Sequence, residues 1–239
     1  MKNSLLLILL FTSFCYSQKY SIGINSLLTT NVDEKQTNIR SSSFIDRNSI
    51  SMYNNGIKIR CTISKIQMGL IATYGQQSFN HIHTQYYEDS LQIKEVDQHS
   101  KRELKMYSLK YFIQWQMYKH NSFSFWIGGL VDWSNLYLKD NGDYWINLYP
   151  DEFYNYSDTD KKGSLFIEPV IDLQFKFFSM LEFDFSVSYS FKSFKMSSER
   201  DVNFTSSFVH LVDPKFKYSF EGLYFGVGIL YLINGEHIK

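Results

Sequence analysis

The chain contains little proline, little cysteine and no excess of either charge. Its 239 residues include three prolines and two cysteines, and 24 Lys plus Arg balance 24 Asp plus Glu. Scarce proline permits long β-strands, because proline cannot donate a hydrogen bond to a strand ladder. Balanced charge offers no electrostatic reason to expect nucleic acid as a partner. The length allows one domain, or at most two small ones.

The sequence also lacks a long apolar run beyond its N-terminus. No stretch there approaches the ~20 apolar residues of a membrane-spanning helix. The opening residues, MKNSLLLILLFTSFCYSQ, combine a positive Lys2, an apolar run over 5–11 and small residues before Gln18. This pattern predicts a secretory signal peptide over residues 1–17 and a mature domain over residues 18–239.

The N-terminus could also be a membrane anchor or a lipoprotein signal, but its residues favour a cleaved signal. A membrane anchor needs a longer apolar run than this one. A lipoprotein signal would be acylated at Cys15, but Phe14 stands where such signals usually carry a small residue. Removal of the signal leaves Cys61 as the one cysteine, so no intramolecular disulfide is expected.

Aromatic residues are abundant, and the dominant pattern has a period of two. The 21 Phe, 18 Tyr and 4 Trp suit a pleated β-surface. In LEFDFSVSYSF, residues 181–191, apolar and polar side chains alternate along the whole stretch. Nine alternating segments are predicted as strands: 19–25, 56–64, 65–75, 104–117, 123–133, 164–178, 181–196, 208–220 and 223–233.

The connections between these segments alternate in length. Short turns are predicted near 64–65, 119–121, 179–180 and 221–222. Longer polar segments are predicted at about 31–48, 79–103, 139–163 and 198–203. Short turns at one end and long polar loops at the other predict an all-β, antiparallel up-and-down meander.

Such a meander could be a soluble sandwich or barrel with its apolar faces inward, or a transmembrane barrel with those faces toward lipid. The polar faces favour the membrane, because they carry both signs of charge and could form a paired network in a narrow lumen. The cations are Lys58, Arg60, Lys110, Lys176, Lys192, Lys215 and Lys217. The acids are Asp132, Glu168, Asp172, Glu182, Asp184 and Asp213.

Strand length and aromatic position favour the same choice. Several segments exceed the ~9–11 residues of a tilted bilayer crossing. Aromatic residues at segment ends are expected in two girdles at the membrane interfaces. The girdle candidates are Tyr118, Phe123, Tyr137, Phe177, Phe178, Phe220 and Tyr224.

The ending CYSQ before YSIGIN, the hairpin GIKIRCTISKIQMGLIATYG and the late GLYFGVGILYL resemble small outer-membrane β-barrel proteins of the Bacteroidetes type. The resemblance implies a barrel of about 8–10 strands with periplasmic turns and extracellular loops, in the bacterial outer membrane. Bacterial single-chain barrels have an even number of strands. The count of nine therefore means that one segment lies outside the wall or is wrongly assigned.

No catalytic, cofactor or metal site is predicted. His81 and His83 share a face of an extended segment, but no suitable further ligands follow them. His210 and Asp213 would point to opposite faces of a strand and could not pair. The glycines of GLYFGVG are not followed by the helix that a nucleotide loop requires.

The most distinctive polar segment lies between 139 and 163, where aromatic and acidic residues are interleaved. Its candidate binding surface comprises Tyr144, Trp145, Tyr149, Tyr154 and Tyr156. The alternative is an ordered hairpin extension over the barrel mouth. The sequence thus predicts a structural or surface-binding barrel that contacts membrane lipid and could bind an extracellular ligand or protein through loops 79–103 and 139–163. A hydrolase acting at the outer leaflet and a small passive pore remain alternatives.

Overall fold

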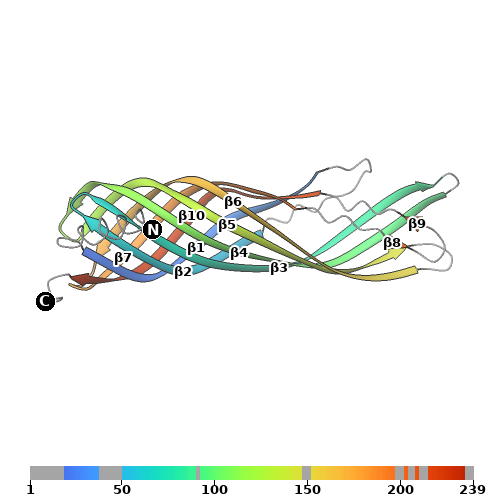
Figure 1. Cartoon of the computed structure of the whole chain (residues 1–239), viewed down its shortest axis with the longest axis horizontal. Helices are drawn as coiled ribbons and strands as arrows, with labels where there is room; N and C mark the ends of the chain where they lie inside the picture. The colour runs from blue at the N-terminus through green and yellow to red at the C-terminus, as the bar shows by residue number, and fades with distance from the viewer. Residues whose placement is uncertain are drawn as a thin grey trace, which may run out of the picture.

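Eight long strands close into an antiparallel barrel (Figure 1). The computed structural model describes residues 19–37, 50–89, 92–146, 152–196, 202–203, 208–209 and 215–234. The wall strands are β1 (Lys19–Thr37), β2 (Ile50–Ile63), β3 (Ile66–Asp89), β4 (Gln92–His120), β5 (Phe123–Ile146), β6 (Glu152–Lys176), β7 (Leu181–Met196) and β10 (Lys215–Asn234). Two short strands, β8 (Val202–Asn203) and β9 (Phe208–Val209), pair with each other outside the ring. The predicted up-and-down barrel is confirmed, because each strand pairs with its sequence neighbours in the wall and β1 closes on β10.

The predicted count of nine strands is wrong, and the error lies in β10. The segments 208–220 and 223–233 were assigned to two strands joined by a turn at 221–222. The structure instead runs one strand from Lys215 to Asn234, and Glu221 and Gly222 pair there with β7.

The glycine at 222 suggests a turn in the sequence, but in the structure it lies inside a strand with an unusual backbone conformation. Its φ of 141° lies in a region that other residues rarely adopt. At this point β10 shifts its register against β1, since Tyr224 pairs with Thr29 while Ser219 pairs with Asp33. The glycine therefore accommodates a β-bulge within a continuous strand.

The two ends of the barrel differ in construction. Turns at 64–65, 121–122 and 177–180 gather at one end, where Lys19 of β1 also pairs with Asn234 of β10. At the other end the hairpins β3–β4 and β5–β6 project well beyond the ring (Figure 1). Barrels of this kind place short turns in the periplasm and long connections outside the cell.

The long segments expected as loops are mostly strand. Pairing in β3–β4 continues to Asp89 and Gln92, and pairing in β5–β6 continues to Ile146 and Glu152. Strands β4 and β5 also stay paired as far as Val96 and Ile146, so the projection is a four-stranded sheet. Only 90–91 and 147–151 of the two predicted loops lie outside the described residues.

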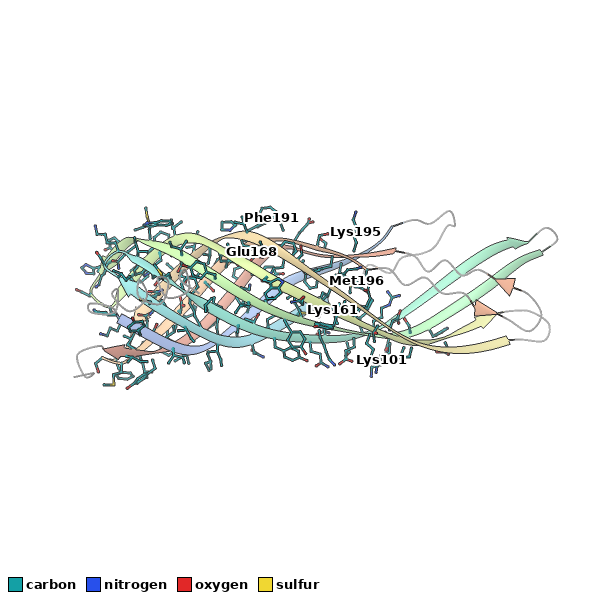
Figure 2. The ribbon with its side chains drawn as sticks, in the orientation of Figure 1. Lys101, Lys161, Glu168, Phe191, Lys195 and Met196 are labelled. Carbon is teal, nitrogen blue, oxygen red and sulfur yellow. The ribbon has the colours of Figure 1, made fainter. Side chains whose placement is uncertain are left out.

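The stretch 181–191 shows how the wall separates its faces. Phe185, Tyr189 and Phe191 are exposed, whereas Asp184 and Ser190 are buried inside the barrel. In Figure 2, Phe191 and Lys195 lie on the outside of the wall, and Glu168 and Met196 turn to the interior. Every wall strand exposes large apolar side chains in this way, among them Ile22, Ile57, Leu70, Leu109, Ile127, Ile167, Phe185 and Val227.

Aromatic side chains mark both edges of the apolar band. At the edge toward the long hairpins, Tyr74, Tyr107 and Tyr137 contact one another across β3, β4 and β5, with ring centroids 4.9 and 5.4 Å apart. At the short-turn edge, Tyr118 and Phe177 are 53% and 69% exposed. Tyr107 and Tyr118 are 11 residues apart on β4. At ~3.3 Å per residue and a tilt of about 40°, the band is roughly 28 Å high, close to that of outer-membrane barrels.

The seam between β6 and β7 is incompletely paired. Strands β6 and β7 pair from Lys176 and Glu182 only as far as Val170 and Ser188. Beyond that rung β7 pairs only with β10, and β6 only with β5, among the residues described. Pro169, the next residue of β6, has no N–H group to extend the ladder.

Side chains connect the two strands where backbone bonds do not. Lys192 Nζ lies 3.2 Å from Glu168 Oε1, and the rings of Phe166 and Phe194 are 5.6 Å apart. An unpaired strand edge at the depth of the hydrocarbon is costly. The seam is therefore a weak part of the wall, and these two side-chain contacts help to hold β6 against β7.

We expect the seam to exchange its amide hydrogens faster than the rest of the wall. In detergent micelles, about half of the amides in 160–169, those facing β7, should exchange at least roughly tenfold faster than amides in 170–176. Hydrogen–deuterium exchange with mass spectrometry measures both peptides, and 123–133 of β5, paired on both sides, is the internal control. Equal protection of 160–169 and 170–176 would contradict the open ladder.

Candidate functional site

The barrel interior is layered, and strand β4 passes through every layer. Its inward side chains, read from the long-hairpin end to the short-turn end, are Arg102, Leu104, Met106, Ser108, Lys110, Phe112 and Gln114, all buried. Arg102 Nε pairs with Asp140 Oδ2 at 3.1 Å. Below that pair follow an apolar layer, two ion clusters and a layer of amides. Strict alternation along one strand thus places at least one inward side chain in every layer.

The lower ion cluster comprises Lys58, Asp172 and Asp184. The Lys58 ammonium lies 3.0 Å from Asp172 Oδ2 and also donates to Asp184. The ring of Phe112 lies beneath the same ammonium, 4.9 Å from its centroid. Toward the short-turn end, Arg60 Nη1 pairs with Glu182 Oε1 at 2.7 Å.

The upper ion cluster comprises Lys110, Lys192, Asp132 and Glu168. Asp132 Oδ2 lies 3.2 Å from Lys110 Nζ and also forms an ion pair with Lys192. Glu168 Oε1 lies 3.2 Å from Lys192 Nζ. All four side chains are at most 3% exposed, so their charges are screened mainly by one another. The ring of Tyr224 also faces both ammonium groups, with centroid distances of 5.6 and 5.1 Å.

The structure brings most of the proposed lumen residues together, but with differences. Lys58, Arg60, Lys110, Asp132, Glu168, Asp172, Glu182 and Asp184 all make ion pairs inside the barrel. Lys176 is exposed at the short-turn mouth and does not belong to either cluster. Asp213 and the side chains of Lys215 and Lys217 lie outside the described part of the chain.

An amide chain that was not assigned to the site lies between the lower ion cluster and the mouth. Gln174 Nε2 donates to Gln67 Oε1 at 3.1 Å, and Gln67 donates to Gln114. All three are at most 2% exposed. The sequence places all three on the polar faces of alternating segments. Because an amide has no charge, nothing in the sequence indicates which other residue it would contact.

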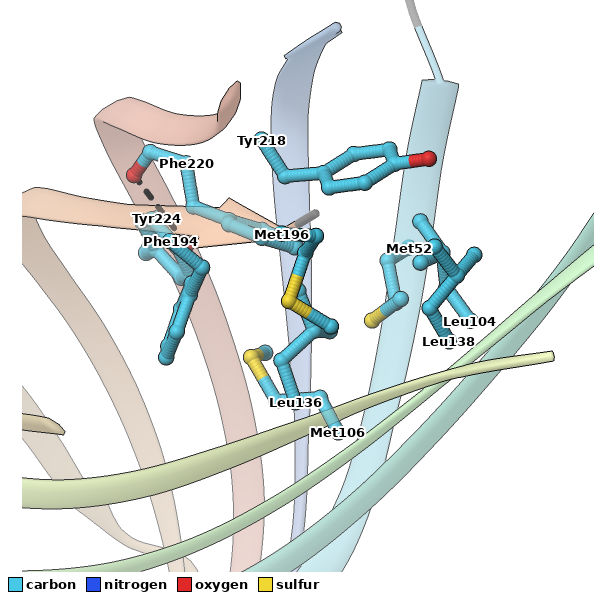
Figure 3. Packing of buried hydrophobic residues seen from close by; sticks show 10 residues of the cluster. All are labelled: Met52, Leu104, Met106, Leu136, Leu138, Phe194, Met196, Tyr218, Phe220 and Tyr224. Atoms are coloured by element: carbon cyan, nitrogen blue, oxygen red, sulfur yellow. Dashed lines mark hydrogen bonds between the residues drawn. The ribbon is translucent and has the colours of Figure 1, made fainter. Parts of the chain in front are cut away.

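The apolar layer is a plug of packed side chains (Figure 3), and it lies on the long-hairpin side of the two ion clusters. It consists of Met52, Leu104, Met106, Leu136, Leu138, Phe194, Met196, Tyr218, Phe220 and Tyr224. None of the ten is more than 6% exposed. The plug and the two ion clusters fill the lumen at these levels, as expected for a barrel of eight strands.

The plug corrects two expectations from the sequence. The sequence predicts Phe220 and Tyr224 in the lipid-facing girdles, and the alternation of the segment 208–220 puts Tyr218 on the same apolar, lipid-facing side as Phe220. All three are buried in the lumen, and Tyr224 Oη donates to the carbonyl of Phe220 at 3.3 Å (Figure 3). The error arose because an aromatic strand end is equally compatible with a girdle and with a lumen plug.

The proposed loop surface can be located only by its backbone. Tyr144 pairs with Tyr154, and Trp145 and Tyr156 lie on the facing strands of the same hairpin, β5–β6. Their side chains and Tyr149 lie outside what the structure describes.

No constellation for catalysis or metal binding is found among the described residues. A hydrolase at the rim would need a histidine within hydrogen-bond reach of a serine or carboxylate. His99 is exposed, and His120 lies at the opposite end, 3.2 Å from the Asn121 amide. Within the same ranges, no group of three or more His, Cys, Asp or Glu could hold a metal ion, and no helix could cross a membrane.

A closed barrel with an apolar, aromatic-edged outer band and a polar, filled lumen defines a membrane-spanning β-barrel of the bacterial outer-membrane type. No protein-family model and no curated protein sequence matches the chain. Solved structures with a similar arrangement of strands include outer-membrane β-barrels at identities of 16% or less, and they bear on the fold alone.

Three of these structures show the levels of sequence identity and coverage. Ail, the attachment invasion locus protein of Yersinia pestis, is 16% identical, with 91% of this chain and 99% of that chain covered and a TM-score of 0.41. Neisserial surface protein A is 9% identical, with 89% and 96% covered and a TM-score of 0.42. The outer membrane protease OmpT of Escherichia coli is 7% identical, with 90% and 96% covered and a TM-score of 0.36.

Proposed function

We propose that the chain is an outer-membrane barrel that holds a four-stranded sheet outside the cell as a binding surface. The observation that carries this proposal is the continuous pairing of β3, β4, β5 and β6 beyond the ring. A flexible loop would pay an ordering cost when it binds, whereas a paired sheet is already ordered. The Bacteroidetes origin implied by the sequence is part of this proposal.

The filled lumen supports an anchoring role over a passive pore. Paired charges and the apolar plug occupy the interior of the described barrel, and their removal from water is balanced by their mutual contacts. The hydrolase alternative has no support from the described histidines. A rigid, plugged barrel would instead fix the direction in which the hairpins project.

The test compares cells that display the full-length chain with cells whose hairpins are shortened. Residues 80–101 and 141–157 would each be replaced by Asn-Gly, since Phe79 pairs with Arg102 and Asp140 with Asp158 at those levels. Both proteins should fold, which the gel shift between unboiled and boiled samples reports. Only the full-length chain should bind to an array of immobilised glycans and extracellular proteins.

Two results would contradict the proposal. Identical array profiles for the two folded proteins would show that the hairpins are not the binding surface. Solute flux through vesicles containing the full-length barrel, above that of empty vesicles, would favour the pore.

A further inference from the structure

A cavity opens at the short-turn end of the barrel, at the end opposite the long hairpins. Its volume is about 360 Å³, enough for a small organic molecule. Its floor lies against Trp126 and Gln174, where the amide chain closes the lumen. By the orientation of such barrels, this cavity faces the periplasm. We call it the mouth cup.

The charge of the mouth cup is strongly one-sided. Among the described residues, four cationic side chains line it, Lys19, Arg60, Lys119 and Lys176, against a single carboxylate, Glu182. The chain as a whole is neutral, with 24 cationic and 24 acidic residues. No described carboxylate forms an ion pair with any of the three lysines, whereas every buried lysine of the ion clusters has one. The excess positive charge is thus local to the cup and raises the local concentration of anions.

Arg60 supplies a second and independent indication. Its side chain is 3% exposed, and Glu182 engages one end of the guanidinium, at Nη1. Neither Nε nor Nη1 makes a hydrogen bond of good geometry among the described residues, although Nη1 lies close to Glu182, and both atoms are closed to solvent. A buried guanidinium donor without a partner is costly. After a small shift of the Arg60 side chain toward the cup, an anionic oxygen there would accept a hydrogen bond from it.

The remaining lining suits an organic anion. Ser64, Ser122 and Ser124 place hydroxyl groups around the cup, and Phe123 and Trp126 provide aromatic surface. Trp126 Nε1 already donates to Ser124 Oγ at 2.9 Å, so its indole is held in place. Polar and charged residues make up most of the lining, so the cup suits a small anion better than an apolar molecule.

We propose that the mouth cup binds a small periplasmic anion carrying two or more carboxylate or phosphate groups. Arg60 would contact one anionic group through its free donor, and Lys119 and Lys176 would contact another from the rim. This site lies at the other end of the barrel from the external sheet, so it is independent of the proposed surface-binding role.

Calorimetry of the full mature barrel in dodecyl maltoside micelles tests the proposal, with citrate and inorganic pyrophosphate as separate probes. One of the two should bind saturably at low salt, and which one binds distinguishes a carboxylate ligand from a phosphate ligand. The exposed rim lysines allow a variant without risk to the fold, Lys119→Gln/Lys176→Gln. Loss of two charge-assisted contacts should weaken binding by at least about tenfold.

The control variant is Lys161→Gln/Lys195→Gln, which removes the same charge from exposed lysines outside the cup. It should leave the dissociation constant within about twofold, because distant exposed charges are screened. Equal weakening in both variants would mean non-specific attraction to a cationic surface and would overturn the proposal. So would the absence of saturable binding for both probes.

Discussion

Replacement of Lys192 by methionine is expected to destabilise the barrel by about 3–5 kcal/mol or to prevent folding, because it leaves buried carboxylates without a cation. Lys192 is fully buried and contacts both Asp132 and Glu168. Lys110 alone would then face the two acids, at 3.2 and 4.0 Å. Lys192 also bridges the unpaired seam, so its loss removes a contact between β6 and β7. Urea unfolding in lipid vesicles measures the change.

Two further variants isolate the buried charge as the cause. Lys195→Met changes an exposed lysine on the same strand and should alter stability by no more than about 0.5 kcal/mol. Lys192→Met/Glu168→Gln removes one charge of each sign and should be more stable than Lys192→Met alone. A single variant as stable as the wild-type chain would show that the upper ion cluster does not contribute to folding.

Replacement of Val227 by arginine is expected to cost about 2–4 kcal/mol in a bilayer, as for a charge near the middle of a lipid-facing strand. Val227 is 49% exposed and lies among the outward apolar residues of β10, between Leu223 and Ile233. In a water-soluble barrel, an arginine at a half-exposed site would change stability little. The variant therefore tests directly which solvent the apolar face meets.

Thr159→Arg is the matched control for that measurement. Thr159 is exposed on β6, beyond the level at which Lys161 pairs with Tyr137 of the aromatic edge. It should change the unfolding free energy by no more than about 1 kcal/mol, because charges near the interface are tolerated. Equal effects at the two positions would contradict the membrane band.

Pro169 is a residue from which the sequence alone indicates an interruption in the wall. The segment 164–178 was predicted as an ordinary wall strand, although a proline inside a strand indicates an edge or a bulge. The structure ends the β6–β7 ladder beside this residue. The sequence could therefore have indicated an interruption, but not which neighbouring strand would lack its bonds.

The sequence by itself determined which side chains face out and which face in along most strands, because a period of two is a local property of extended backbone. It did not determine which charged side chains pair with each other. It also did not determine which aromatic side chains of β10 face the lumen. Lys58 and Asp184 are 126 residues apart, and they meet only because the closed ring brings β2 and β7 to the same level of the lumen. The apolar plug, the bulge at Gly222 and the mouth cup likewise depend on strand register around the whole barrel, which no single segment specifies.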